Sequence, residues 1–340
     1  MPLPNPTLEE NRSDFMARCV IDSNIRNDFD TIEQRVAVCN SLWEEANDSK
    51  FNKALKAAKD NWQMSFEAKL AQSEKKAIRE TYKYYQSEYE KGIEIFIQQQ
   101  GLQYNNTIGL FKQTELNAIY EMIYIKIGND FSKWYLKNSS KLISKFDANA
   151  YESIWEKNFA FIGSQVAGQR VIGVQGTVRK TLMSVTQRLM TDKDFMVAGE
   201  VVQARILKKE FKKYSTYQAK RLVRTESTFA ANYASMVAAK DIFAGKDLMK
   251  EWIAAMDERT RPAHAQANMG KPIPANDKFI VGGESLMIPG DPAGSAGNVI
   301  NCRCSAPFFP KPEAEVIGGN ISSILGGIAV GEIIDLVSGQ

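Results

Sequence analysis

The chain has 340 residues, a formal net charge of +3, four cysteines and a single histidine, His264. This length suggests two or three structural units and allows a sizeable hydrophobic core. One histidine excludes multi-histidine metal centres, and four cysteines are too few for a disulfide-rich secreted scaffold. The near balance of 43 basic and 40 acidic residues argues against a protein that coats nucleic acid. We therefore expect a globular protein that is made and first used in a reducing cytoplasm.

Proline divides the chain into two parts of different character. All eleven prolines lie before Thr7 or after Arg261. Because proline is excluded from helix interiors, the long proline-free stretch predicts a predominantly α-helical structure. The last part is rich in proline and glycine, which predicts short strands and turns. The predicted fold class is mainly α with a small α+β C-terminal module, in which long helices are followed by short strands and a β-hairpin.

The helices are expected to begin with a hairpin of two short helices over residues 14–47. A long or broken helix over 51–100 is rich in Ala, Lys, Glu and Gln, and Gly101 ends it. Further helices are expected over 112–137, 147–161, 178–189 and 194–245, the last broken near 214–216. Four glycines between Gly163 and Gly176 predict the main internal joint of the chain.

Short strands are expected near the C-terminus. Residues 250–256 and 302–309 each predict one, and residues 279–281 and 286–288 flank Gly282 and Gly283 as a hairpin. The glycine-rich stretch over 316–331 is uncharged but contains polar residues and is followed by two acids, so it falls short of a membrane-spanning helix. We expect it to pack or to bind a partner.

The densest group of uncommon residues lies between Arg221 and Cys304. An Arg-Thr-Glu element comes first, and a tryptophan, a D-x-R-T-R-x-x-H turn, a glycine and a closing N-C-R-C follow. This order resembles the phage Mu F-type minor head protein family, also called the phage head morphogenesis domain, over about residues 211–309. The residues that carry the resemblance are Arg224, Glu226, Trp252, Asp257, Arg259, His264, Gly270, Asn301, Cys302 and Cys304.

The resemblance implies a minor structural protein of a tailed-phage head, which acts in capsid assembly or head morphogenesis near the portal. It implies a location in the capsid interior or at the portal vertex, after assembly in the host cytoplasm. The portal protein and other head proteins are the expected partners, with packaged DNA as a further candidate. No membrane during assembly, no small-molecule substrate, no catalytic residue and no cofactor are expected. The alternatives are a head-carried effector enzyme, either toxin-like or a Cys- or metal-dependent hydrolase, and a DNA-binding accessory protein.

With this resemblance the chain divides into five segments. They are an N-terminal helical hairpin over 1–50, a long-helix arm over 51–162, the helical part of the head morphogenesis domain over 163–245, a small α+β module over 246–312 and a glycine-rich apolar tail over 313–340. A fainter resemblance, to a short helical module of phage head proteins, covers Phe15 to Trp43. Its two cysteines, Cys19 and Cys39, are expected to pack as core thiols rather than to form a disulfide.

Two acidic residues of the cluster invite a structural interpretation. Glu226 shares the apolar face of its predicted helix with Leu222, so a buried carboxylate there needs a partner. We expect Arg259, Arg261 or the backbone amides of the following turn, unless Glu226 lies at the solvent edge. Asp257 suits an Asx-type turn cap before a short helix that starts at Pro262.

Cys302 and Cys304 flank one residue, so on a strand both thiols point to the same face. With His264 they form either a packed, hydrogen-bonded group, which is the expectation, or part of a zinc site. Some members of the resembled family have a Cys-x-x-Cys where this chain has Arg261 and His264. Because arginine cannot bind zinc, a fourth ligand would have to be Asp257 or water. A nucleophilic cysteine with His264 as base lacks an evident orienting or oxyanion group.

One stretch is strongly basic. From Arg205 to Arg224 the sequence has eight Lys or Arg residues and one acid, Glu210, with aromatic residues between them. The stretch is either a solvated helix face or a contact surface for DNA or an acidic partner. The candidate contact residues are Lys208, Lys209, Lys212, Lys213, Lys220 and Arg221.

Overall fold

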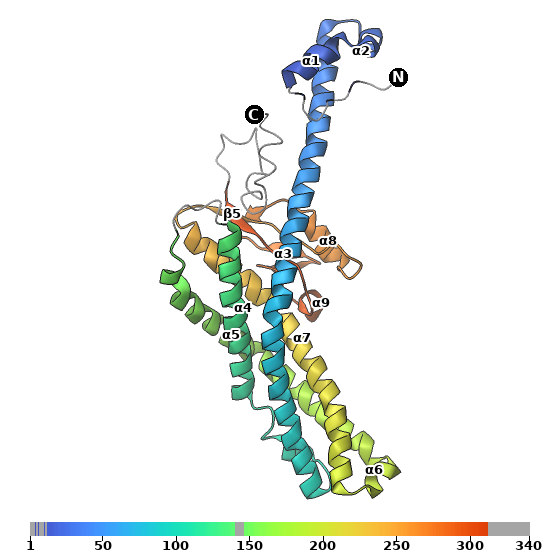
Figure 1. Ribbon diagram of the computed structural model, residues 1–340, viewed down its shortest axis with the longest axis vertical. Helices are drawn as coiled ribbons and strands as arrows, with labels where there is room; N and C mark the ends of the chain where they lie inside the picture. The colour runs from blue at the N-terminus through green and yellow to red at the C-terminus, as the bar shows by residue number, and fades with distance from the viewer. Residues whose placement is uncertain (1–3, 5, 7–9, 11, 140–145, 312–340) are drawn as a thin grey trace. The chain divides into compact units, whose positions relative to one another are not determined.

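The computed structural model describes residues 4, 6, 10, 12–139 and 146–311 (Figure 1). It confirms the predicted class: long helices come first, and a few short antiparallel strands follow near the C-terminus. The described residues form two compact units, one reaching to Trp62 and the other extending from Gln63 to Lys311. The five predicted segments remain a prediction, and the 313–340 tail lies outside the described residues.

The first unit contains α1 (Arg12–Ile21), α2 (Ser23–Asp28) and the beginning of α3 (Ile32–Gln99). Phe15, Cys19, Ile25 and Cys39 form its small core. Cys19 and Cys39 form a disulfide, which corrects the expectation of two reduced thiols. The turn after α1 returns the chain so that their Cα atoms lie 5.9 Å apart, within the range that a disulfide can bridge.

The long helix α3 is limited by two local signals. At its start, the backbone N–H of Gln34 donates to the hydroxyl of Thr31, and the backbone N–H of Thr31 donates to the side-chain oxygen of Gln34, each at 3.3 Å. This reciprocal pair is a capping box. At its end, the Gly101 amide donates to the carbonyl of Phe96 at 3.1 Å. The predicted end is therefore confirmed. The second helix of the predicted hairpin is the beginning of α3 rather than a separate element.

The second unit is a helical bundle with a small module of strands. After the remainder of α3, its helices are η1 (Tyr104–Thr107), α4 (Gln113–Ser139), α5 (Asn149–Met190), α6 (Lys193–Val197) and α7 (Glu200–Ile242). α4 packs against both α5 and α7. Aromatic rings fill much of the core; the ring of Tyr89 on α3 stacks on Phe211 of α7 with 4.6 Å between centroids. The expected break in α7 near Tyr214 is absent.

The expected joint at Gly163–Gly176 is wrong, because α5 continues through all four glycines. Gly163 lies against α4, where an added Cβ would come within 3.0 Å of Tyr124 and 3.1 Å of Glu121. One turn earlier on α5, the ring of Phe159 covers Gly128 of α4. Gly128 and Gly163 thus allow the backbones of α4 and α5 to approach closely. The cooperative hydrogen bonding of α5 outweighs the low helix propensity of its four glycines.

The C-terminal module contains two small sheets and two short helices. β1 (Leu248–Lys250) is the central strand of a three-stranded antiparallel sheet, between β2 (Ile273–Pro274) and β5 (Phe308–Pro310). β3 (Phe279–Val281) and β4 (Glu284–Leu286) form the predicted hairpin. The second strand begins at Glu284, two residues earlier than predicted. α8 (Pro262–Asn268) and α9 (Ala296–Val299) connect these strands.

The strands expected over 250–256 and 302–309 are wrong in extent, because β1 ends at Lys250 and β5 begins at Phe308. Beyond the ladder of β1 and β5, a single bridge pairs Ile253 with Ser305. Backbone groups of Cys302, Cys304 and Ala306 are hydrogen-bonded to side chains of α7 instead.

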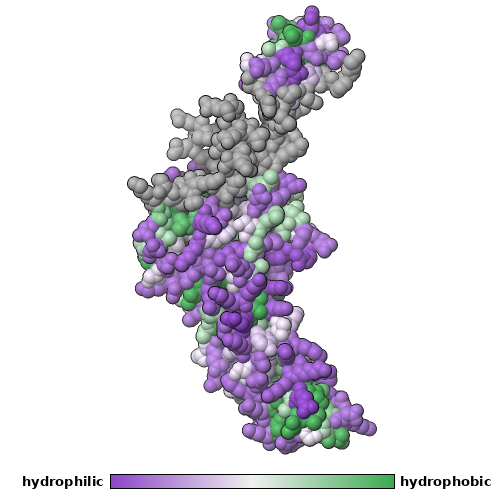
Figure 2. All heavy atoms as spheres, in the orientation of Figure 1, coloured by the Kyte–Doolittle hydropathy of each residue, from purple (hydrophilic) through white to green (hydrophobic). Residues whose placement is uncertain are grey.

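Hydrophobic side chains are exposed where α6 joins α7. Met196, Val197, Val201 and Val202 are 41–84% exposed, and Figure 2 shows hydrophobic surface at this end of the bundle. We call these four residues the apolar end. Among the described residues, no helix has both the length and the apolar character that crossing a membrane requires.

The close contact between α4 and α5 yields a prediction with an internal control. In Gly128→Ala the new Cβ would lie 2.4 Å from the Phe159 ring, so we expect a loss of about 1–3 kcal/mol in the free energy of unfolding. In Gly168→Ala, where no atom lies within 4 Å of the new Cβ, we expect a gain of about 1 kcal/mol from helix propensity. Urea unfolding followed by circular dichroism measures both. Equal effects would contradict the packing role of Gly128.

Candidate functional site

The middle of α7 is buried around its whole circumference. From Thr225 to Asn232 every residue is buried, and most side chains are small. A helix buried on all sides must give each polar side chain a partner. Glu226, Ser227 and Thr228 are consecutive and reach three different neighbours, because successive residues of a helix point about 100° apart.

Glu226 is bound by the helical bundle. Arg170 of α5 donates to its carboxylate at 2.6 Å, and the hydroxyl of Tyr124 on α4 donates at 3.0 Å. This corrects the expected partners, Arg259 and Arg261, which are exposed or half-buried in the C-terminal module. Arg170 lies in the glycine-containing stretch that the sequence marked as a joint, so no sequence signal connected it with Glu226. Burial raises the pKa of Glu226, and Arg170 opposes that shift.

Ser227 and Arg224 both reach α3. The Ser227 hydroxyl donates to the carboxylate of Glu74 at 2.6 Å. Arg224, a predicted motif residue, is half-exposed, and its Nε lies 4.0 Å from the same carboxylate. Burial raises the pKa of Glu74, and the hydrogen bond from Ser227 and the charge of Arg224 oppose the shift. The Arg-Thr-Glu element thus joins three helices of the bundle.

Thr228 and Asn232, one turn apart on α7, hold the C-terminal module. The Thr228 hydroxyl donates to the carbonyl of Cys302. The Asn232 amide donates to the carbonyl of Cys304 at 3.1 Å, and its oxygen accepts from the amide of Ala306 at 2.7 Å. Neither residue was predicted from the sequence. The available signal was an i, i+4 pair of polar residues in an alanine-rich helix that is too apolar to be a surface helix.

The module also packs against α7 and α3 at close range. Gly290 has a φ of +84°, and an added Cβ there would lie 2.8 Å from the backbone nitrogen of Phe229. Glycine is therefore required for both conformation and space. On the other side, Gln63 of α3 donates to the carbonyl of Arg303 at 2.7 Å and accepts from the hydroxyl of Ser305 at 2.6 Å.

Trp252 lies at the centre of the module core. It packs with Phe279, Val281, Leu286 and the two cysteines. Its ring lies edge-on to both Phe279 and His264, with 5.4 Å between centroids in each case. The predicted tryptophan, histidine and closing cysteines thus meet in one core.

Asp257 organises the turn before α8. Its carboxylate accepts from the Arg259 amide at 3.1 Å, as in an Asx turn, and Pro262 is the first residue of α8. The sequence did not predict a stronger partner, Arg303, whose two terminal nitrogens donate to Asp257 at 2.8 and 2.6 Å. These hydrogen bonds hold the pKa of Asp257 well below its usual range. The pair connects the turn before α8 with the closing Asn-Cys-Arg-Cys segment.

One compact unit thus contains α7, Trp252, the Asp257 turn and the closing Asn-Cys-Arg-Cys segment. Residues 193–307 match the family model described as Phage Mu protein F like protein. The match begins with α6 and ends before β5. Residues 193–307 are thus similar to that family, and we refer to them as the Mu F-like domain. No curated protein and no solved structure matches the chain.

Two further motif residues of the Mu F-like domain have backbone roles. Asn301 has a φ of +54°, a left-handed conformation that asparagine tolerates better than most residues. It directs the chain from α9 into the Cys302–Cys304 segment. Gly270 ends α8, and its amide donates to the carbonyl of Ala267 at 3.1 Å.

His264, Cys302 and Cys304 form a buried group in the Mu F-like domain. The His264 Nδ1 lies 3.3 Å from the Sγ of Cys304 and 3.8 Å from that of Cys302. Its Nε2 lies 3.3 Å from the side-chain oxygen of Asn298. Hydrogen bonds from Cys304 and His264 lower the pKa of Cys302, while burial and the neighbouring Cys302 raise that of Cys304.

This group offers three ligands of the kind that zinc prefers. The three ligand atoms lie within 4.8 Å of one another, and the side-chain oxygen of Asn298, by accepting from Nε2 of His264, would orient the ring so that Nδ1 faces the metal. Among the described residues, no fourth Cys, His, Asp or Glu joins the group. Asp257, the carboxylate suggested by the sequence, is bound to Arg303 at the surface. A water molecule would therefore have to complete four-coordination.

The predicted basic residues are distributed along α7 of the Mu F-like domain. Lys208, Lys209 and Lys212 are exposed beside a hollow formed with α3. Lys213 forms an ion pair with Glu210 at 2.9 Å, and Arg188 of α5 binds the same carboxylate at 3.0 Å. Lys220 is exposed, and Arg221 borders a cavity that is described below. Glu210 therefore neutralises part of the positive charge in the middle of the stretch, and the lysines on either side remain exposed.

The contacts of Asn232 predict a large loss of stability on truncation. Asn232→Ala leaves the buried Ala306 amide and Cys304 carbonyl without this partner, so we expect the free energy of unfolding to fall by about 3 kcal/mol. Asn129→Ala removes a surface amide that contacts Glu156 and is expected to change it by less than about 0.5 kcal/mol. Urea unfolding measures both variants. A loss for Asn232→Ala no larger than that for the control would contradict the proposed anchoring role.

The raised pKa of Glu226 predicts a specific pH dependence. Between the unfolded and the higher folded pKa, the native state binds more protons, so this group's contribution to stability falls as pH rises. Relative to Glu226→Gln, the wild type should lose stability as the pH rises above about 4, the ordinary pKa of a glutamate side chain. Urea unfolding of both proteins at increasing pH gives the difference, in which all other titrating groups cancel. A difference that grows with pH would show that Arg170 holds the carboxylate ionised.

Proposed function

We propose that the protein is a minor structural protein of a tailed-phage head, acting in capsid assembly or head morphogenesis near the portal. The observation that supports this most directly is the Mu F-like domain over residues 193–307. The proposal places the protein in the virion, in the capsid interior or at the portal vertex. Its partners would be the portal protein and other head proteins.

The geometry of the domain supports a structural rather than a catalytic role. The buried motif residues Trp252, His264, Cys302 and Cys304 pack against one another in the core of the C-terminal module, and Glu226 is held by Arg170 of α5 and Tyr124 of α4. His264, Cys302 and Cys304 are at most 4% exposed, so a substrate cannot reach them without opening the core. We propose that they stabilise the module without a cofactor, with three-ligand zinc binding as the alternative.

Two surfaces of the second unit are suited to partners. The apolar end exposes four hydrophobic side chains from adjoining segments, and exposed groups of this kind are typical of protein interfaces (Figure 2). The exposed lysines of α7 are suited to packaged DNA or to an acidic protein face. We propose that the apolar end docks on another head protein, and that the lysines provide a second, salt-dependent contact.

The test is incorporation into virions. Phage carrying the wild-type chain should yield purified heads that contain this protein in few copies, measured by quantitative mass spectrometry. In Val197→Asp/Val201→Asp, a charge at the apolar end should reduce incorporation at least about tenfold, because burying an unpaired carboxylate is unfavourable.

The control is Ile172→Asp, which places the same charge at an exposed position of α5 and should be incorporated normally. Absence of the wild-type protein from heads would overturn the proposed function. Normal incorporation of the Val197→Asp/Val201→Asp protein would leave the head assignment intact and overturn the docking role of the apolar end.

A further inference from the structure

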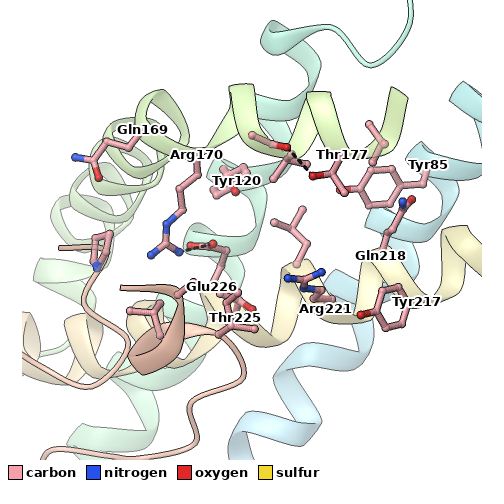
Figure 3. Close-up of a pocket in the computed structure, with 18 of the residues that line it drawn as sticks. Tyr85, Tyr120, Gln169, Arg170, Thr177, Tyr217, Gln218, Arg221, Thr225 and Glu226 are labelled. Carbon is pink, nitrogen blue, oxygen red and sulfur yellow. Dashed lines mark hydrogen bonds and ion pairs between the residues drawn. The ribbon is translucent and has the colours of Figure 1, made fainter. Parts of the chain in front are cut away.

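The bundle contains a cavity of about 530 Å³ whose wall includes the Arg170–Glu226 pair. Its wall comes from α5 and α7, with Tyr85 of α3, Tyr120 of α4 and the segment around α9 closing its sides (Figure 3). The volume lies in the range of small-molecule sites, which is about 300–1,000 Å³. The surface is largely apolar, and polar side chains of α5 and α7 are distributed along it (Figure 3). This combination is typical of a site for a small organic ligand.

One charged part of the cavity wall is the Arg170–Glu226 ion pair. Figure 3 shows Arg170 extending from α5 toward Glu226 on α7. A guanidinium carries five N–H groups, and the ion pair with Glu226 is formed by one terminal nitrogen. The Arg170 side chain is about one-fifth exposed and lines the cavity.

Tyr120 provides a second, independent observation. Its side chain is fully buried and borders the cavity, and its hydroxyl has no hydrogen-bond partner among the described residues. A buried hydroxyl without a partner is costly, and such groups in native proteins often mark a functional site or a missing ligand. Burial and the nearby carboxylate of Glu226 raise the pKa of Tyr120, so the group remains a proton donor.

The charges on the wall favour an anion. Arg170 and Arg221 border the cavity, and Glu226 is the carboxylate that opposes them. Arg221 is exposed and forms no ion pair among the described residues, so its charge is available. Tyr214, Tyr217 and Leu222 add flat and apolar surface next to these cations. We propose that the cavity binds a small organic anion, with its charged group at Arg170 and Arg221 and a flat apolar body against the tyrosines.

Phenyl phosphate is a suitable probe, because it combines a flat ring with a phosphate group. Titration of the full chain by calorimetry should detect its binding at millimolar concentrations, and inorganic phosphate and neutral benzyl alcohol should each bind at least about tenfold more weakly. Arg221→Ala, an exposed position whose loss does not endanger the fold, should weaken phenyl phosphate binding about tenfold. Lys208→Ala removes an exposed charge of the same helix away from the cavity and should leave binding unchanged.

Tyr120→Phe separates binding from folding. Removing a hydroxyl that has no partner should leave the free energy of unfolding unchanged or raise it, while phenyl phosphate binding falls about fivefold. Three outcomes would overturn the proposal: no detectable binding of phenyl phosphate, binding of benzyl alcohol as tight as that of phenyl phosphate, or equal weakening by Arg221→Ala and Lys208→Ala. The last would indicate attraction to the basic helix in general.

Discussion

The burial of α7 on all sides between Thr225 and Asn232 is the constraint on which the rest of the second unit depends. A helical stretch with no exposed face can be surrounded only if its side chains are small and its polar groups are paired. The stretch from Thr225 to Asn232 meets both conditions. Glu226, Ser227 and Thr228 each bind a different neighbour, and Asn232 repeats the direction of Thr228 one turn later. Three consecutive residues thereby fix α5, α3 and the C-terminal module around one axis.

The module depends on α7 for part of its backbone hydrogen bonding. Its own sheet is short, and the segment from Cys302 to Ala306 forms only one bridge with Ile253. Thr228, Asn232 and Gln63 complete the pairing of that segment from outside. Such a module has little independent stability and takes its shape from the bundle. This arrangement explains why motif residues separated by some 80 positions in the sequence belong to one structural unit, and it suits a part that presents a fixed surface to a partner.

The same ion pair has two consequences. Arg170 and Glu226 join α5 to α7, and both side chains also line the largely apolar cavity. A buried ion pair contributes little net stability when compared with apolar residues of similar size. Here the pair lies near the fully buried Tyr120 hydroxyl, which has no hydrogen-bond partner among the described residues, and both belong to the proposed ligand site. The cavity lies between α5, α7 and the α9 segment of the module, whereas Thr228 and Asn232 of α7 bind the Cys302–Ala306 segment, so substitutions at these two places test the two roles separately.

The sequence by itself determined the class of the fold, the succession of long helices and short strands, and the similarity of the C-terminal part to a known family. Proline placement, the end of α3 near Gly101 and the hairpin around Gly282 are local signals, since each depends on backbone conformations that neighbouring residues dictate. Likewise, the order of Arg224, Trp252, Asp257 and Cys302 could be compared with a family without any coordinates. Local signals also explain the main error among the helices: four glycines indicate a break when only short-range propensity is considered.

Tertiary structure alone decided which residues meet. Gly128 and Gly163 became contact points because α4 and α5 cross there, and the cross-helix packing stabilises a helix that propensity would interrupt. Arg170 replaced Arg261 as the partner of Glu226, and Arg303 joined Asp257, because direction around a helix and across a module decides which charges come within reach. Cys19 and Cys39 paired because a turn brought them into one core. The cavity exists only between packed helices, and a single sequence carries no record of the space that its folded elements leave between them.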